Sequence, residues 1–588
     1  RRWEEDRVQD EGTEGMIYSY GYGDGGGGPT RELVEAALRC RDLEGAPRAV
    51  FEGPEAYFRK LEERGCENVF SGELYLAWHR GTYTAQAKTK LGVRRAECLL
   101  KEAEYWNTLL ALRELQNGRS LEADAGAGKR AERLHILWKR LLMQEFHDIL
   151  PGTGIARVHQ EAEEELAEVA RLTKDCLAES LTELEQAVRA DGGDGKRAVS
   201  SNDGNGADAA GTGRNGSCPE ARGQRLSREG EEFLLQSDLL TVRLNRAGQV
   251  LSLRPEGPGE AWEAAGEPMN TFRLYRNVNS YYDAWEIGSM YEQEEEALDT
   301  ADWHMTEDVF EGRPAWRLEG RIKESPLTQY ICLSPDGRMA EFHTRIDWQE
   351  RHRMLKVDFP AAFRSDHVTA EVACGAWTRP TTRSYQWEKD RYEVCGHRYS
   401  VLEDGRYGLA LINDCKYGFS AKEDRISLTL LRSPLMPDMH ADQGRQEFSY
   451  ACFPYAGAFR NAQVLERAAE FNRRSHVDAA LRERQERLTE VLGTFALQPE
   501  GGAQGTVCHV FPEAVKLAED GSGRAVLRLY ESAGCPQRVR LLLPEGLRKA
   551  CVWESTPLEE TGRELCVKDG CVELEFQKFE IRTLLLSV

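Results

Sequence analysis

A run of glycines near the start of the chain surrounds one carboxylate. Residues 20–30 read Tyr-Gly-Tyr-Gly-Asp-Gly-Gly-Gly-Gly-Pro-Thr, so Asp24 is the one acidic residue among six glycines. Glycine adopts left-handed conformations easily and lets the backbone approach a ligand closely. The loop can therefore hold Asp24 at a fixed position beside a ligand. No Gly-Lys-Ser/Thr follows, which argues against a nucleotide-binding loop. A flexible loop with an incidental aspartate stays open as the alternative.

A histidine and an aspartate stand together near the end of an expected helix. Residues 144–153 read Gln-Glu-Phe-His-Asp-Ile-Leu-Pro-Gly-Thr. At 100° per residue the apolar stripe of this helix lies near Leu141 and Ile149, and His147 falls on the opposite side, beside Gln144. His147 is therefore not expected in the core. It is either a surface histidine or a metal ligand that faces a cleft, oriented by a neighbouring carboxylate.

Aromatic, histidine and arginine side chains crowd into a third segment. Residues 72–86 read Gly-Glu-Leu-Tyr-Leu-Ala-Trp-His-Arg-Gly-Thr-Tyr-Thr-Ala-Gln and contain His79. Side chains of these types stack on sugar faces and hydrogen-bond to hydroxyl groups, and they also pack against helices without any ligand. Both interpretations stay open from the residues alone.

These three segments must be positioned by a chain whose pattern changes twice. Apolar residues recur at three- and four-residue spacing, which predicts helices at 31–39, 55–64, 75–117, 131–149 and 158–188. Residues 191–223 are rich in glycine and asparagine and predict a linker or a disordered loop. From about residue 229 short apolar and alternating runs predict many antiparallel strands, interrupted by one helix at about 462–492. A last strand-rich module is expected from about 506 to Val588.

Composition limits the classes of function. The 588 residues carry a formal net charge of −22, which disfavours general nucleic-acid binding because the surface repels phosphates. No run approaches the roughly 20 apolar residues that a membrane span needs, so no membrane partner is expected. The 15 cysteines form no Cys-x-x-Cys pair, which favours reduced thiols in a cytoplasmic protein.

The order and spacing of the three segments resemble one family, the bacterial and cytosolic-type α-mannosidases of glycoside hydrolase family 38. The resemblance continues in residues 282–287, 347–352, 411–418 and 441–445, and it covers nearly the whole chain except 191–223. It implies a multidomain α+β protein. The expected parts are the C-terminal end of an α/β catalytic domain (1–30), a helical-bundle middle domain (31–190), a linker (191–228), a large antiparallel β-sandwich domain (229–500) and a C-terminal β domain (501–588).

The resemblance also assigns roles to five residues. It implies that His147 is a zinc ligand, that Asp148 binds sugar hydroxyls, and that Asp24 is the general acid/base. His79 is expected to line the sugar site, and Arg432 is expected to reach that site from the sandwich. One Zn²⁺ is the implied cofactor.

The resemblance implies ligands that the sequence does not supply. A structural or catalytic zinc takes more than one histidine or carboxylate, and in the family a His-x-Asp pair and the nucleophilic aspartate precede the glycine loop. Only Arg1–Ser19 precede that loop here, so the chain is expected to be N-terminally incomplete and inactive by itself. Two His-x-Asp triplets, at 440–442 and 476–478, are assigned to chance because of their place in the chain.

The expected function is thus a retaining, zinc-dependent α-mannosidase that removes terminal α-linked mannose. Its partner would be a mannose-containing oligosaccharide, and association into homo-oligomers agrees with the family. The alternative is a non-catalytic carbohydrate-binding or assembly module that keeps the fold without the chemistry.

Overall fold

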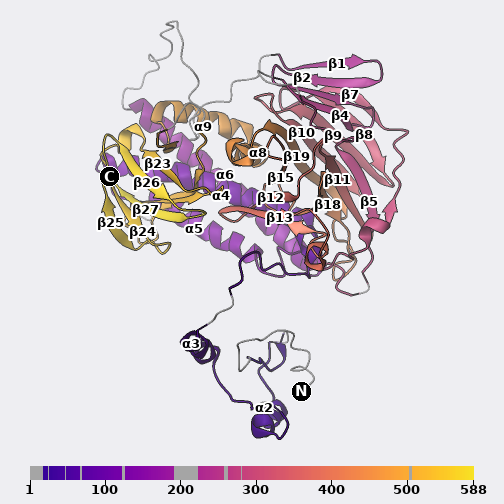
Figure 1. The fold of residues 1–588 in the computed structure, drawn as a ribbon. Coiled ribbons are helices and arrows are strands. Elements are labelled where there is room, and N and C mark those ends of the chain that lie inside the picture. Colours follow the sequence, from indigo (N-terminus) through magenta and orange to yellow (C-terminus); the bar gives the residue numbers. More distant parts are fainter. Residues whose placement is uncertain are drawn as a thin grey trace. The chain divides into compact units, whose positions relative to one another are not determined.

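The computed structural model describes residues 17–23, 26–46, 48–65, 69–121, 126–190, 223–256, 262–279, 281–501 and 506–588. The chain divides into two compact units, Arg1–Leu76 and Ala77–Val588 (Figure 1). Asp24 lies outside the described residues. Among the described residues, no helix is both long and apolar enough to cross a membrane.

The first unit contains helices α2 (Arg31–Arg39) and α3 (Pro54–Arg64), with the short 3-10 turn η2 (Cys40–Asp42) after α2. The hydroxyl of Thr30 accepts a hydrogen bond of 3.3 Å from the amide of Leu33 and so caps α2. Neither α2 nor α3 buries a residue. Both helices lie where the spacing predicts them, but in a different unit from the later helices.

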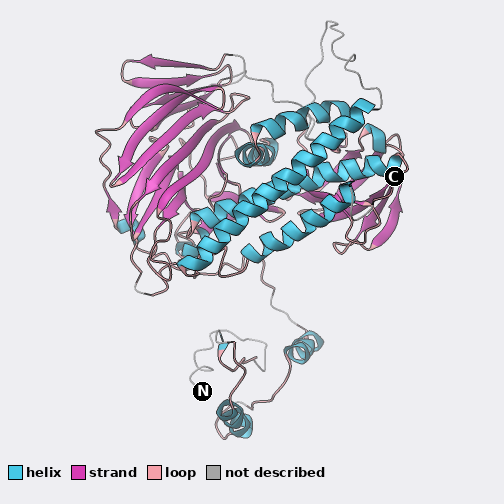
Figure 2. Ribbon diagram, turned by 180° about the vertical axis from the view of Figure 1, so that it is seen from behind, coloured by secondary structure: helices cyan, strands magenta, loops and turns pink. Residues whose placement is uncertain are grey.

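Three long helices begin the second unit: α4 (Ala87–Gln116), α5 (Gly126–Gln144) and α6 (Ala156–Ala190). They pack against one another, as Figure 2 shows in cyan. The prediction places the start of α4 twelve residues too early, because His79 and Gln86 have left-handed backbones around the 3-10 turn η3 (Arg80–Tyr83). It also extends α5 too far, since residues 145–152 form turns.

Strands dominate the rest of the second unit, and the described residues form five antiparallel sheets. The first has the order β1 (Arg225–Glu229), β2 (Glu232–Gln236), β3 (Leu240–Leu244), β4 (Val250–Pro255). A nine-stranded sheet has the order β13 (Gly375–Pro380), β12 (His367–Val372), β15 (Tyr399–Glu403), β16 (Tyr407–Asn413), β19 (Gly444–Ala456), β10 (Ala340–Trp348), β9 (Ser325–Leu333), β8 (Arg313–Ile322), β7 (His304–Phe310). A six-stranded sheet has the order β14 (Val394–Cys395), β17 (Gly418–Lys422), β18 (Arg425–Arg432), β11 (Arg353–Pro360), β5 (Thr271–Arg276), β6 (Glu295–Glu296). The short helical segments among these strands are η4 (Tyr291–Gln293) and α7 (Gln386–Lys389).

Two smaller sheets follow in the C-terminal part. Their orders are β20 (Ala496–Pro499), β23 (Gln537–Leu542), β26 (Cys571–Phe576) and β21 (Val510–Leu517), β22 (Ala525–Glu531), β27 (Ile581–Ser587), β24 (Cys551–Ser555), β25 (Thr561–Leu565), with the turn η6 (Glu545–Leu547) between β23 and β24. The expected helix at 462–492 is two helices, α8 (Val464–His476) and α9 (Ala479–Leu492), preceded by the turn η5 (Phe459–Asn461). The fold class predicted from the sequence, a helical domain followed by large antiparallel β domains, is confirmed.

Within the second unit, α4, α5 and α6 lie between the large sheets and the C-terminal sheets (Figures 1 and 2). One continuous hydrophobic core joins apolar side chains of α4, α5 and α6 to those of the C-terminal strands, with Leu99 and Trp106 on the helical side and Leu527 and Leu584 on the strand side. A second core packs α8 against the nine-stranded sheet through Phe471. The helical domain therefore packs directly on the C-terminal β-structure, and α8 packs on the nine-stranded sheet.

Candidate functional site

His147 and Asp148 lie on the turn that follows α5. The amides of Ile149 and Leu150 donate to the carbonyl of Phe146 at 2.9 and 3.2 Å, which closes this turn. The side chains of His147 and Asp148 are 77% and 57% exposed, and Nε2 of the imidazole lies 3.8 Å from Oδ2 of the carboxylate. The sequence-based expectation that His147 avoids the core is confirmed. An exposed imidazole beside a carboxylate is free to accept an ion or a ligand from one side.

The turn is fastened to the segment that carries His79. The ammonium of Lys90 is 3% exposed and donates to the carbonyls of Ala85 at 2.5 Å and of Leu150 at 2.8 Å. Gly152, with φ of 84°, packs so tightly that an added Cβ would lie 2.5 Å from the carbonyl oxygen of Ala85. Burial lowers the pKa of Lys90 to about 7, although the nearby Asp442 opposes the shift.

His79 is positioned through its backbone. Its φ is 62°, and its amide donates to Oε1 of Glu286 at 2.6 Å, while its side chain is exposed. Two residues later the amide of Gly81 donates to the carbonyl of Trp285 at 2.7 Å. An added Cβ at Gly81 would lie 2.6 Å from the carbonyl of Ala284, so only glycine fits here without a shift.

Arg432, at the end of β18, binds the loop formed by residues 283–286, which includes the Glu286 that binds the amide of His79. Its guanidinium is 1% exposed and donates to the carbonyls of Asp283, Ala284 and Glu286, the bond to Ala284 measuring 2.9 Å. Nε donates to Oδ1 of Asn277 at 2.8 Å. Burial lowers the pKa of Arg432 to about 10, and Asp283 opposes the shift. These contacts are all to the protein, and so little of the side chain is exposed that it presents no surface to a sugar.

Two further carboxylates fix the start of α4. Oδ1 of Asp442 accepts from the amide of Ala87 at 2.7 Å, and Oδ2 of Asp438 accepts from the side chain of Gln86 at 2.7 Å. An acidic group at the N-terminal end of a helix also interacts favourably with the helix dipole. Asp442 of the His-x-Asp triplet at 440–442 therefore has a structural contact, and His476 of the other triplet is buried with Nε2 3.0 Å from the carbonyl of Asp414.

Four segments far apart in the sequence thus meet at one place. They are residues 79–90, 145–153, 277–286 and 432–442, joined by the hydrogen bonds of Lys90, Glu286, Arg432 and Asp442. His79, His147, Asp148 and Arg432 belong to these joined segments, with Arg432 buried and the other three side chains exposed. Lys90 and Glu286, which position these segments, were not predicted from the sequence. The sequence gives no sign that Lys90 is buried, because a lysine within a helix is usually exposed to solvent.

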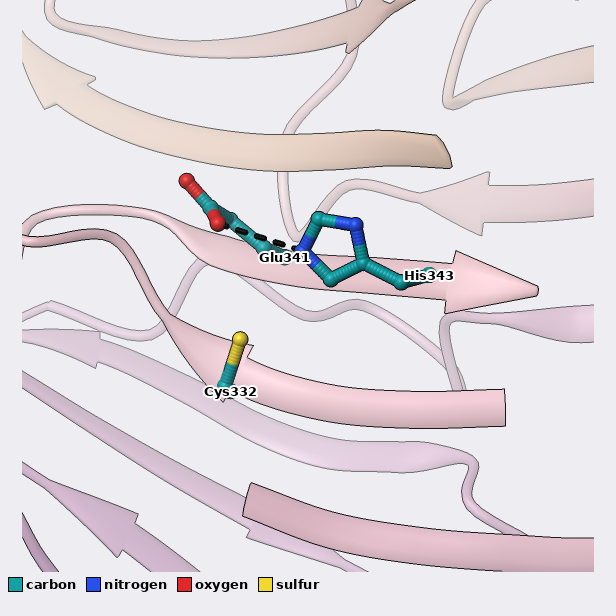
Figure 3. A group of neighbouring side chains, drawn as sticks. All are labelled: Cys332, Glu341 and His343. Atoms are coloured by element: carbon teal, nitrogen blue, oxygen red, sulfur yellow. Dashed lines mark hydrogen bonds and ion pairs between the residues drawn. The ribbon is translucent and has the colours of Figure 1, made fainter. Parts of the chain in front are cut away.

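The described residues contain one cluster of three side chains that could hold a metal ion, and it lies elsewhere. Cys332, Glu341 and His343 offer ligand atoms within 4.8 Å of one another (Figure 3). However, Arg313 pairs with Glu341 at 2.7 Å and Arg474 also donates to it. Burial opposes ionisation of Glu341, but Arg474 and Arg313 outweigh it and hold its pKa well below the usual range. Burial raises the pKa of the Cys332 thiol to about 12. The cluster is therefore an ion-pair network with a neutral thiol beside it.

The chain matches three family descriptions in succession. Residues 77–184 match "Alpha mannosidase middle domain", residues 235–440 match "Glycosyl hydrolases family 38 C-terminal domain", and residues 509–584 match "Glycosyl hydrolases family 38 C-terminal beta sandwich domain". Of the four segments that meet at the candidate site, 79–90 and 145–153 lie within the first match and 277–286 lies within the second, which ends inside 432–442.

Named relatives agree with these matches. Alpha-mannosidase 2C1 of Homo sapiens is 30% identical over 97% of this chain, which spans 56% of that protein. Alpha-mannosidase G of Dictyostelium discoideum is 26% identical over 89% of the chain, which spans 53% of it. The chain thus spans about half the length of these relatives. An alpha-mannosidase structure from Enterococcus faecalis superposes with a TM-score of 0.64 and 13% identity, covering 95% of this chain and 75% of that one, which shows the same fold. The chain belongs to glycosyl hydrolase family 38.

Proposed function

We propose that the protein carrying this chain is a retaining α-mannosidase that releases terminal α-linked mannose from oligosaccharides with the help of a bound zinc ion. The hydrogen bonds that tie the segment of His79 to the turn of His147 and Asp148 carry this proposal. The family membership and the names of the relatives support the same reaction. Mannose-containing oligosaccharides are the proposed substrates, and the cytoplasm is the proposed compartment.

His147 is the proposed metal ligand. Its imidazole fits this role because it is exposed and lies beside a carboxylate, an arrangement that orients metal-bound histidines. Among the described residues His147 joins no group of three ligands, so we assign no further ligand in this part of the chain. A zinc ion at this place would serve as a template and Lewis acid for sugar hydroxyls rather than as a source of hydroxide.

Asp148 is proposed to accept hydrogen bonds from hydroxyls of the mannose ring that undergoes cleavage. Its carboxylate is exposed on the same turn as His147, so a ring bound at one side chain lies within reach of the other. Such hydrogen bonds orient the ring, and orientation lowers the barrier only if the turn itself is rigid. Lys90 and Gly152 supply this rigidity by fastening the turn to Ala85.

His79 is proposed to line the same sugar site, with its backbone fixed by Glu286. Arg432 is proposed to act through the loop 283–286 rather than by touching sugar, because its guanidinium is buried beneath that loop. Asp24, which lies outside the described residues, is proposed as the acid that protonates the leaving oxygen. Retention of configuration also requires a carboxylate nucleophile about 5–5.5 Å from the acid, and we assign it to no described residue.

The decisive experiment measures metal content and hydrolysis in the intact protein. We expect release of mannose from an aryl α-mannoside with retained anomeric configuration, followed by NMR. His147→Ala is expected to lose both bound zinc, measured by mass spectrometry, and at least about 100-fold in kcat/KM, the size of effect expected for a metal ligand. Asp148→Asn is expected to keep the zinc and lose activity.

His135→Ala is the matched control, because His135 lies on α5 and is partly exposed without belonging to the four joined segments. A protein that binds mannosides but releases no mannose would instead be a carbohydrate-binding module. Wild-type zinc content and activity in His147→Ala would exclude the proposed site.

A further inference from the structure

Two exposed aromatic side chains stand on the segment between β13 and β14. Tyr385 is 64% exposed and Trp387 is 52% exposed. Their ring planes are 9° from parallel, and their centroids lie 6.3 Å apart. Exposed aromatic rings keep a large apolar area in contact with water, and a ligand that covers them removes this area from water.

The backbone beneath these rings is fixed. The carboxylate of Glu388 accepts from the amides of Ser384 at 2.6 Å and Tyr385 at 3.0 Å. Arg391 donates to the carbonyl of Trp387 at 2.8 Å, and its guanidinium lies 5.1 Å from the centre of the indole ring. A ligand that lands on the rings therefore meets a segment that is already ordered, which reduces the entropic cost of binding.

The segment is joined to the candidate site through Arg80. This arginine follows His79, is 5% exposed, and donates twice to the carbonyl of Asp390, at 3.1 Å from Nε and 2.7 Å from Nη2. Its guanidinium also stacks 4.2 Å from the ring centre of Tyr392. The hydroxyl of Tyr392 in turn donates to the carbonyl of Ile287 at 2.7 Å, next to the loop that holds His79. The aromatic pair and the site thus share one rigid framework.

We infer that Tyr385 and Trp387 form a saccharide-binding platform for sugar residues beyond the mannose that is cleaved. This inference rests on the proposed function. The carbon-bound hydrogens on one face of a pyranose are apolar and slightly positive, and they fit the negative face of an aromatic ring. Gln386, which precedes Trp387 in α7, has an exposed side chain that is hydrogen-bonded to Asp390 at 2.9 Å and offers a partner for hydroxyl groups.

A second copy of the chain fits this surface less well. A stable protein interface buries on the order of 1,200–2,000 Å² around an apolar centre. Here the guanidinium of Arg391 lies over the Trp387 ring, and the same short helix carries the exposed polar side chains of Gln386 and Lys389. Such mixed surroundings suit a hydroxylated ligand.

The test compares two substrates of the intact protein. Trp387→Ala and Tyr385→Ala are expected to raise KM for an α-mannose oligosaccharide of four or more residues by about 3–10-fold, the effect of one lost aromatic contact. KM and kcat for an aryl α-mannoside are expected to stay at wild-type values, because that substrate carries no sugar residue beyond the mannose that is cleaved. Trp387→Phe should recover most of the oligosaccharide affinity. Leu558→Ala is the control, because Leu558 is 83% exposed on the C-terminal module.

Unchanged KM for the oligosaccharide in both alanine variants would overturn the platform, and so would an equal loss on both substrates or a change of native mass alone. Calorimetric titration with the same oligosaccharide separates the two proposals. If the wild-type protein cleaves no mannoside yet binds the oligosaccharide, and Trp387→Ala abolishes binding, the platform stands while the hydrolytic function fails.

Discussion

Gly152 packs directly on the backbone of Ala85, and this contact sets the place of the turn that carries His147. An added Cβ at residue 152 would lie 2.5 Å from the carbonyl oxygen and 2.7 Å from the carbonyl carbon of Ala85. Backbone atoms cannot move aside as a flexible side chain can. Lys90 strengthens the same contact, since it binds the carbonyls on both sides of it.

Gly152→Ala is therefore expected to lower the free energy of unfolding by about 2–4 kcal/mol, through a clash in addition to the strain of a positive φ. Because the turn must shift, the variant is also expected to bind less zinc. Chemical denaturation and metal analysis measure the two effects. Gly118→Ala is a matched control: Gly118 has φ of 74° but no atom within 4 Å of its added Cβ, so only about 1 kcal/mol of strain is expected there.

Arg432→Lys is expected to destabilise the loop 283–286. A lysine has a single nitrogen and cannot reproduce the fork of donors that reaches the carbonyls of Asp283, Ala284 and Glu286. Buried carbonyls without donors cost about 1–3 kcal/mol each, so a melting point several degrees below wild type is expected by calorimetry. Arg445→Lys, at an exposed position, is the control and should change the melting point little. A wild-type melting point for Arg432→Lys would show that the loop does not depend on this arginine.

The contact between Glu286 and His79 can be tested by a pair of variants. Glu286→Gln keeps a side-chain oxygen that can accept from the amide of His79, whereas Glu286→Ala removes it. The alanine variant is expected to lose about 1–2 kcal/mol of stability, because a hydrogen bond to a charged group is lost. It is also expected to raise KM for an aryl α-mannoside, while the glutamine variant stays closer to wild type. Equal kinetics for the two variants would contradict a positioning role for Glu286.

Acidification is expected to destabilise the second unit through His476. Burial lowers the pKa of His476 to about 4, although Asp414 opposes the shift. In the unfolded chain this histidine takes up a proton near pH 6.5. Between pH 6.5 and 4 the unfolded chain therefore holds more protons than the folded chain, and the free energy of unfolding decreases as the pH is lowered. At pH 5 the loss from this group is about 2 kcal/mol relative to pH 7.

His476→Gln should remove this part of the pH dependence, because a glutamine amide can donate to the carbonyl of Asp414 but takes up no proton. Urea denaturation at pH 7 and pH 5 measures the difference between the two proteins. His440→Gln, at an exposed position, should leave the pH dependence unchanged. A loss of the same size in wild type and His476→Gln would contradict the assignment to His476.

The sequence predicted the elements of this fold better than their ends. The apolar spacing of α4 and α6 and the alternation of β3 are local patterns, and they agree with the structure. The start of α4 was misplaced because left-handed residues such as Gln86 depend on distant contacts, here with Asp438. The sequence around Gln86 does not indicate a contact with a residue as distant as Asp438.

The exposure of His147 was predictable from the sequence, whereas the residues that support its turn were not. His147 could be placed off the apolar stripe by counting residues along the helix. Arg432, however, was expected to reach a sugar, and the structure buries it beneath the loop that a sugar site would need. Burial of a charged side chain with several backbone partners follows from tertiary packing, which the residue types around position 432 do not reveal.

The core shared by α4, α5, α6 and the C-terminal strands also has a consequence for folding during synthesis. Helix α6 ends at Ala190, whereas the first strand of the sheet that covers this side, β21, begins at Val510. A ribosome adding 5–20 residues per second needs on the order of tens of seconds to synthesise the chain in between. During this interval the apolar surface of the helices that later packs on the C-terminal strands stays exposed. The nascent protein is therefore expected to bind chaperones at this stage, and premature release from the ribosome would favour aggregation.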